Sequence, residues 1–246
     1  MSDEICITKE KHIVQQISKK ISNYLDIKDS VLKNDYIEFL CDFSKVIGFF
    51  QKSTKVLLQK KFEAFLTGFR NNENPTEEQL EKLSNYINNE EKAEFIADTL
   101  SKILLSKSRK SCLIMGYIMQ KIVDNKRTLS HYDLIYIDSL TNFFDNDILN
   151  FKFFCKYLLT ETRSQRLFIY NNKLFKEECL KSNIDNYSMM LTIEKCVSCQ
   201  LLIKKNEIDL DIDEDDVILS SVENDNYYII SNPGKILYKY INELNL

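Results

Sequence analysis

The sequence contains few of the residues that interrupt helices and few of those that most often serve catalysis. Among 246 residues there are four Gly, two Pro, two His and no Trp. Scarce Gly and Pro predict long helices joined by short connections. Neither His12 nor His131 has a plausible Ser or Cys nucleophile beside it in the sequence, so no catalytic triad is indicated. Glycine-rich phosphate-binding motifs are also missing. We therefore expect a non-enzymatic protein that needs no cofactor.

Long apolar runs and a secretion signal are lacking too. The longest apolar run, CLIMGYIM at 112–119, is far shorter than the roughly 20 residues that span a bilayer. The N-terminal residues MSDEICITKEKH contain no apolar signal core. Seven Cys are scattered mostly within apolar helical patterns, which is typical of reduced, buried thiols. The sequence thus predicts a cytoplasmic protein without a membrane span.

Helical periodicity is what the sequence does contain. Apolar residues recur at helical spacing over 91–106 and 111–123. Ser130 and Asp133 are placed to cap a helix that continues through Phe144. The acidic segment Asp145–Asp147 is interpreted as a break before a helix at 148–159. Further helical patterns fall at 9–25, 30–50 and 55–70, with a capping box at 76–79.

The C-terminal fifth combines helical and extended patterns. Residues 191–203 predict a helix that runs into a short strand. Residues 217–230 favour strands around a turn at Asn224–Asn226, and Pro233-Gly234 opens a last helix. This order is that of a winged-helix module. The predicted fold is mainly α: a multi-helix bundle over 1–145, then a winged-helix-like module with a small β-hairpin over 146–246. The polar stretch 160–166 is the alternative boundary.

Two motifs suggest metal binding but match poorly. Cys196-x-x-Cys199 has the spacing of a zinc or redox pair, but no second Cys or His pair accompanies it, so core packing on a helix is favoured. Asp209-x-Asp211-x-Asp213 resembles the start of a calcium loop, but the Gly and Glu that such a loop needs later are replaced by Glu214 and Ser220. We expect no metal site and interpret 207–216 as a solvated acidic loop.

The charge distribution argues against nucleic-acid binding by the C-terminal module. Five basic and eleven acidic residues fall between Tyr187 and Leu246, whereas DNA binding needs cations along the phosphates. Two basic clusters lie at successive helix joints further upstream, and they are candidate contacts for an anion or a nucleic acid if the joints share one surface. The candidates are Lys102, Lys107, Arg109, Lys110, Lys126 and Arg127. The alternative is that these are solvated helix ends.

An aromatic helix near residues 143–157 is the candidate protein interface. It carries more large apolar side chains than one helical stripe can bury, and the candidates are Phe151, Phe153, Phe154 and Tyr157. The alternative is a helix buried on several sides.

Part of the sequence resembles a known group. Lys61, Phe62, Phe65 and Leu66, followed by the EKA helix at 91–104 and the tail YYIISNPGKILYKYI, resemble uncharacterised bacterial helical proteins and the Abi-alpha abortive-infection family. The resemblance implies a role in bacterial antiphage or mobile-element conflict, with no reaction attached. The function expected is therefore protein–protein interaction with a protein partner, including a homodimer or larger homo-oligomer. The alternatives are a DNA-binding winged-helix regulator and an enzyme of unrecognised type.

Overall fold

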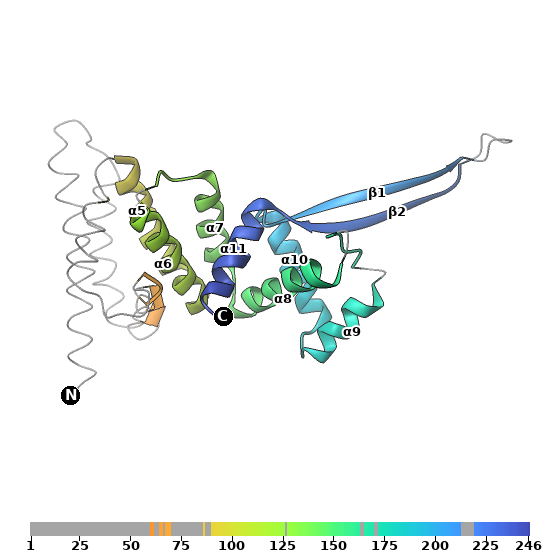
Figure 1. Ribbon diagram of the computed structural model, residues 1–246, viewed down its shortest axis with the longest axis horizontal. Coiled ribbons are helices and arrows are strands. Elements are labelled where there is room, and N and C mark those ends of the chain that lie inside the picture. Colours follow the sequence, from red (N-terminus) through yellow and green to blue (C-terminus); the bar gives the residue numbers. More distant parts are fainter. Residues whose placement is uncertain are drawn as a thin grey trace. The chain divides into compact units, whose positions relative to one another are not determined.

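The computed structural model describes residues 60, 61, 64, 65, 67–69, 86, 90–125, 127–162, 165–169, 172–212 and 219–246 (Figure 1). The helices predicted at 9–25 and 30–50, and the capping box at 76–79, lie outside these residues. The described chain is mainly helical and carries one two-stranded antiparallel sheet. It divides into two compact units between Phe143 and Phe144, two residues before the predicted boundary. Within the described residues, no helix has the length and apolarity needed to cross a membrane.

The first unit is built around α6 (Arg109–Asp124), which packs against α5 (Glu90–Leu105) and α7 (His131–Asn142). Helix α6 is buried around most of its circumference, as its nearly uniform apolar sequence predicts. Gly68 and Gly116 allow a close approach of two backbones in this unit, because a Cβ atom at either would lie 1.9 Å from a carbonyl oxygen, that of Leu113 or of Phe65. The predicted helices at 91–106 and 111–123 are confirmed.

The second unit is built around α8 (Asp145–Glu161), against which α10 (Asn186–Ser198) and α11 (Asn232–Glu243) pack. The predicted break at Asp145–Asp147 is wrong, because these residues form the first turn of α8. The reason is local: the Asp147 carboxylate accepts a hydrogen bond from the backbone N–H of Phe144, at 2.8 Å, and so starts the helix. The short helix α9 (Lys173–Lys181) was not predicted.

Strands β1 (Leu202–Ile212) and β2 (Leu219–Ile230) run side by side as a long ribbon (Figure 1). At about 3.3 Å per residue, eleven residues of β1 extend about 36 Å. The hairpin is confirmed, but two details of the prediction are wrong. Asn224–Asn226 is not a turn, since it pairs with Asn206–Ile208 inside the sheet, and 207–212 belongs to β1 rather than to a loop. Ile208, Leu210 and Ile212 alternate with acidic residues, which is the period of a strand.

The base of the hairpin is joined to the helices at two points. Leu167, between α8 and α9, exchanges both backbone hydrogen bonds with Tyr228 of β2, at 3.0 and 3.1 Å. Ser231 caps α11 and bonds to the carbonyl oxygen of Leu201 at the end of the α10–β1 turn. Gly234 lies against the same carbonyl, and a Cβ atom there would come within 2.1 Å of that oxygen. The Pro-Gly start predicted for the last helix is therefore confirmed, with the glycine required by close packing.

Candidate functional site

The aromatic side chains predicted as an interface belong to the core of the second unit. Phe151, Phe154 and Tyr157 are buried, and Phe153 is half-buried. Phe175 of α9 contacts three of them, with its ring centroid 5.0 Å from that of Tyr157, 6.0 Å from that of Phe154 and 6.2 Å from that of Phe153. The prediction failed because α9, the helix that occupies this face of α8, was not recognised in the sequence. These four residues therefore do not form an exposed contact surface of the single chain.

A line of polar side chains joins α8 to α10. Asp147 of α8 accepts a hydrogen bond from the Thr192 hydroxyl at 2.9 Å and pairs with the Lys195 ammonium at 2.5 Å. The Asn150 amide donates to the hydroxyls of Thr192 and Ser188, both at 3.1 Å. Since Asp147, Asn150 and Thr192 are buried, each of these bonds satisfies a group that would be costly to leave unpaired. The network fixes which face of α10 turns toward α8.

The opposite face of α10 is exposed and largely apolar. Tyr187 and Leu191 follow one another by one helical turn and retain 83% and 70% of their possible exposure. Glu194 and Ser198 continue this stripe on the exposed side of the helix. Lys195, the one basic residue of α10, is bound to Asp147 and lies 4.9 Å above the Phe144 ring. The exposed stripe of α10 thus combines two large apolar side chains with a carboxylate and carries no cation.

The two predicted basic clusters lie at opposite ends of α6. Sixteen helical residues separate the α5–α6 joint from the α6–α7 joint, which amounts to about 24 Å. At the first joint, Lys107 and Arg109 are exposed and Lys110 is half-buried. Lys102 bridges two carboxylates, with Nζ 3.1 Å from Asp98 and 3.4 Å from Asp138. Lys126, at the second joint, lies outside the described residues.

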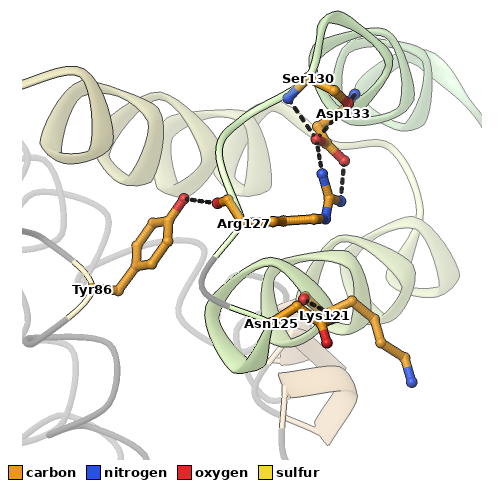
Figure 2. Close-up of polar contacts among 6 residues, drawn as sticks. All are labelled: Tyr86, Lys121, Asn125, Arg127, Ser130 and Asp133. Atoms are coloured by element: carbon orange, nitrogen blue, oxygen red, sulfur yellow. Dashed lines mark hydrogen bonds and ion pairs between the residues drawn. The ribbon is translucent and has the colours of Figure 1, made fainter.

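Arg127, the other residue of the second cluster, has a structural partner (Figure 2). Its guanidinium meets the buried Asp133 carboxylate with two bonds of 2.5 and 2.6 Å. Ser130 completes the predicted capping box, since its backbone N–H and its hydroxyl both donate to Asp133. Burial alone would raise the pKa of Asp133, but the hydrogen bonds from Arg127 and Ser130 outweigh it and lower the pKa of this carboxyl. Arg127 therefore stabilises the start of α7 rather than offering an anion site.

Four of the five cysteines that the structure describes have buried thiols. Cys112, Cys155, Cys179 and Cys196 are buried, and Cys199 is half-buried at the end of α10. Burial raises the pKa of the Cys155 and Cys196 thiols well above the ordinary value, and burial together with the Glu178 carboxylate raises that of Cys179 to about 11. Because the thiolate is the reactive form, these groups are poor nucleophiles and poor metal ligands at neutral pH.

The acidic motif at 209–213 and His131 are the remaining candidates from the sequence. Asp209 and Asp211 are strand positions two residues apart in β1, so the calcium-loop pattern is not a loop, and Asp213 lies outside the described residues. No group of three or more His, Cys, Asp or Glu side chains suited to a metal ion occurs among the residues that the structure describes. His131 is exposed at the first position of α7, directly after the capping residue Ser130.

Sequence reasoning missed the exposed stripe of α10. Tyr187 lies outside the predicted helix, which was started at residue 191, so its spacing to Leu191 was not considered. Asp185, whose carboxylate accepts the Ser188 N–H at 2.8 Å, is a recognisable N-cap and would have placed the helix start correctly. No protein-family model matches this chain, and neither curated proteins nor solved structures include one that is detectably similar to it.

Proposed function

We propose that this chain is a non-enzymatic interaction protein that self-associates through the exposed face of α10. The observation that carries the proposal is the pair Tyr187 and Leu191, the most exposed large apolar side chains of this helix. Neither side chain is needed to hold α10 in place, since the Asp147–Thr192–Asn150 network and the buried Met189, Ile193 and Cys196 do so from the other side. Apolar surface that does not serve the fold is typical of a contact site.

A second copy of the chain fits this face because the face is self-complementary. A two-fold dimer brings the same patch of each copy together. In an antiparallel pair of α10 helices centred on Leu191, the two Leu191 side chains meet. Tyr187 and Glu194 lie one turn on either side of Leu191, so the Tyr187 hydroxyl of one copy faces the Glu194 carboxylate of the other, which within its own chain already accepts a hydrogen bond from the Tyr228 hydroxyl at 3.2 Å. Interfaces built on one short patch are weak, which predicts a concentration-dependent dimer.

The second unit is proposed to be a winged-helix module. Its order, with α8, the Leu167 bridge, α9, α10, the β1–β2 hairpin and α11, supports this assignment. In that arrangement α10 occupies the position of a DNA-recognition helix. Its exposed stripe carries Glu194 and no Lys or Arg, whereas phosphate and base contacts depend on cations. The stripe favours a protein surface over the alternative of a DNA-binding regulator.

The biological setting proposed is bacterial antiphage or mobile-element conflict in the cytoplasm. The setting rests on the resemblance of residues 55–155 to uncharacterised bacterial helical proteins and of the C-terminal tail to an ending that occurs in Abi-alpha-type proteins. The five described cysteines are free rather than disulfide-bonded, which is typical of a reducing compartment. In such a system a self-associating helical protein would serve as a sensor, an adaptor or an effector component.

Replacing Leu191 tests the proposed dimer. Leu191→Gln keeps helix propensity nearly unchanged while removing the apolar contact. The matched control is Leu180→Gln on α9, whose leucine is 64% exposed and lies outside the α10 stripe. Sedimentation velocity over a hundredfold range of concentration should show a wild-type dimer that persists at 0.5 M salt. Leu191→Gln should sediment as a monomer and Leu180→Gln as wild type. A monomeric wild type, or equal effects of the two variants, would contradict the proposal.

A further inference from the structure

The base of the hairpin contains a basic groove, although the C-terminal segment as a whole carries a net negative charge. A cavity of about 250 Å³ opens between β1, β2, α11 and the chain that precedes α9. Three cationic side chains line it: Arg166, Lys205 and Lys235. Gln165 and Tyr227 add polar groups, and two isoleucines of β2 supply apolar wall. None of the described residues that line the groove is acidic, although the segment from Tyr187 onward is acidic as a whole.

The fold holds the groove in shape from several directions. The Leu167–Tyr228 bridge is buried and fixes Arg166 beside β2. The Arg166 guanidinium carbon lies 4.9 Å from the centroid of the Tyr227 ring, and the Phe168 ring lies 5.4 Å from the same ring. Lys205 is the register partner of Tyr227 on β1. These contacts hold Arg166 and Tyr227 in place, while Lys205 and Lys235 extend as exposed side chains from regular positions of β1 and α11.

Lys235 places a positive charge at the N-terminal end of α11. It lies in the first turn of α11, where the helix dipole disfavours a cation and favours an anion. No acidic residue occupies that first turn. An anion held between Lys235, Lys205 and Arg166 would therefore gain from the helix end as well as from the three cations.

We propose that this groove binds a compact phosphate-class anion, either inorganic phosphate or the phosphoryl group of a small metabolite. The volume is below the 300–1,000 Å³ typical of pockets for larger ligands. Along the hairpin from Lys205–Tyr227, the register continues through Glu207–Asp225 and Asp209–Glu223, so a polyanion running along the ribbon passes acidic register positions that a compact anion at the hairpin base does not reach. The groove is separate from the exposed stripe of α10, so the inference does not rest on the proposed dimer.

Paired lysine variants provide a matched test. Lys205→Gln removes a cation of the groove. Lys204→Gln removes the neighbouring cation from the opposite strand face, where its ammonium lies 4.0 Å from Glu194. Lys235→Gln and Lys239→Gln form a second pair on α11, since Lys239 is exposed one turn beyond the groove residue. Each pair has the same change in net charge, and circular dichroism melting curves would verify that all four variants are folded.

The full-length protein is titrated at constant ionic strength with inorganic phosphate, with adenosine monophosphate and with a single-stranded oligonucleotide, using calorimetry. Loss of one charge-assisted bond should weaken phosphate binding about tenfold in Lys205→Gln and Lys235→Gln. Lys204→Gln and Lys239→Gln should change it less than twofold. Binding of phosphate points to the free ion, and binding of the monophosphate alone points to a metabolite. No binding at 10 mM, equal weakening within each pair, or binding of the oligonucleotide alone would overturn the proposal.

Discussion

Arg127 and Asp133 form a two-point ion pair in which Nη1 and Nη2 of the guanidinium lie 2.5 and 2.6 Å from Oδ2 and Oδ1 of the carboxylate (Figure 2). Asp133 is fully buried, whereas about a third of the Arg127 side chain remains exposed. The same carboxylate closes the capping box of α7. The buried charge of Asp133 is therefore compensated by Arg127, which precedes α7 in the chain.

Replacing that arginine should destabilise the first unit. Arg127→Gln leaves the buried carboxylate without its charged partner, and we expect the free energy of unfolding to fall by about 1–3 kcal/mol. Urea denaturation followed by circular dichroism measures the change. Arg109→Gln is the control, because Arg109 is exposed in the first turn of α6, where the helix dipole disfavours a cation. A loss in Arg109→Gln as large as in Arg127→Gln would show that the effect is one of net charge.

The contribution of this pair should depend on pH in a defined direction. The folded state lowers the pKa of Asp133 below the ordinary value of 3.8. A lowered pKa stabilises the folded state above the unfolded pKa, and the stabilisation is lost as the pH falls through the folded pKa. The stability difference between wild type and Arg127→Gln should therefore be constant from pH 7 to about pH 5 and shrink below pH 3.8. A difference that stays constant down to pH 2 would contradict an ionised Asp133 as its source.

The seam between α8 and α10 should be equally sensitive to its carboxylate. Asp147→Asn removes the charge that pairs with Lys195 and places an amide donor beside the donors of Thr192 and Phe144. We expect a loss of about 2–3 kcal/mol in the second unit, measured by urea denaturation. Asp145→Asn is the matched control for removing a carboxylate from the first turn of the same helix, because Asp145 is exposed whereas Asp147 is buried. Similar losses in both variants would contradict a special contribution of the α8–α10 seam.

The parts of the fold that the sequence predicts correctly are those with local signals. Helices α5 and α6 have long apolar periodicity, the α7 capping box lies within four residues, and α11 opens with Pro-Gly. Strand β1 was misread because a run of acidic residues resembles a solvated loop, although its apolar residues alternate. Its partner lies across the hairpin, and pairing with β2 is what makes the acidic segment extended.

The candidate sites depend on contacts between distant residues, which one sequence does not reveal. Phe154 looked available for an interface because nothing near it in the chain predicts that Phe175 covers it. The basic groove is not predicted for a similar reason. The net charge of the segment from Tyr187 onward does not include Arg166, which the Leu167–Tyr228 bridge brings to the hairpin base. The two basic clusters, in contrast, are close in sequence, but the sixteen residues of α6 place them about 24 Å apart along the helix axis.

At Gly234, packing and intrinsic helix propensity predict opposite effects of a Gly→Ala change on stability. In an exposed helix, Gly→Ala stabilises by roughly 0.5–1 kcal/mol, because alanine has the higher helix propensity. At residue 234 the added methyl would lie 2.1 Å from the Leu201 carbonyl oxygen and 2.9 Å from a methyl group of Ile230. Since the obstacle is backbone, either α11 or the α10–β1 turn must move, and overpacking of this kind typically costs about 1–3 kcal/mol.

We therefore expect Gly234→Ala to lower the midpoint of thermal unfolding, measured by circular dichroism, whereas Asn242→Ala, at an exposed position of the same helix, should leave it unchanged or raise it slightly. The Ser231 hydroxyl, which bonds both the Gly234 N–H and the Leu201 carbonyl, would be displaced by the same movement. Adding Ser231→Ala to Gly234→Ala should then cost less than the sum of the two single changes, because they disrupt one junction. A stabilising Gly234→Ala would contradict the close contact between α11 and the α10–β1 turn.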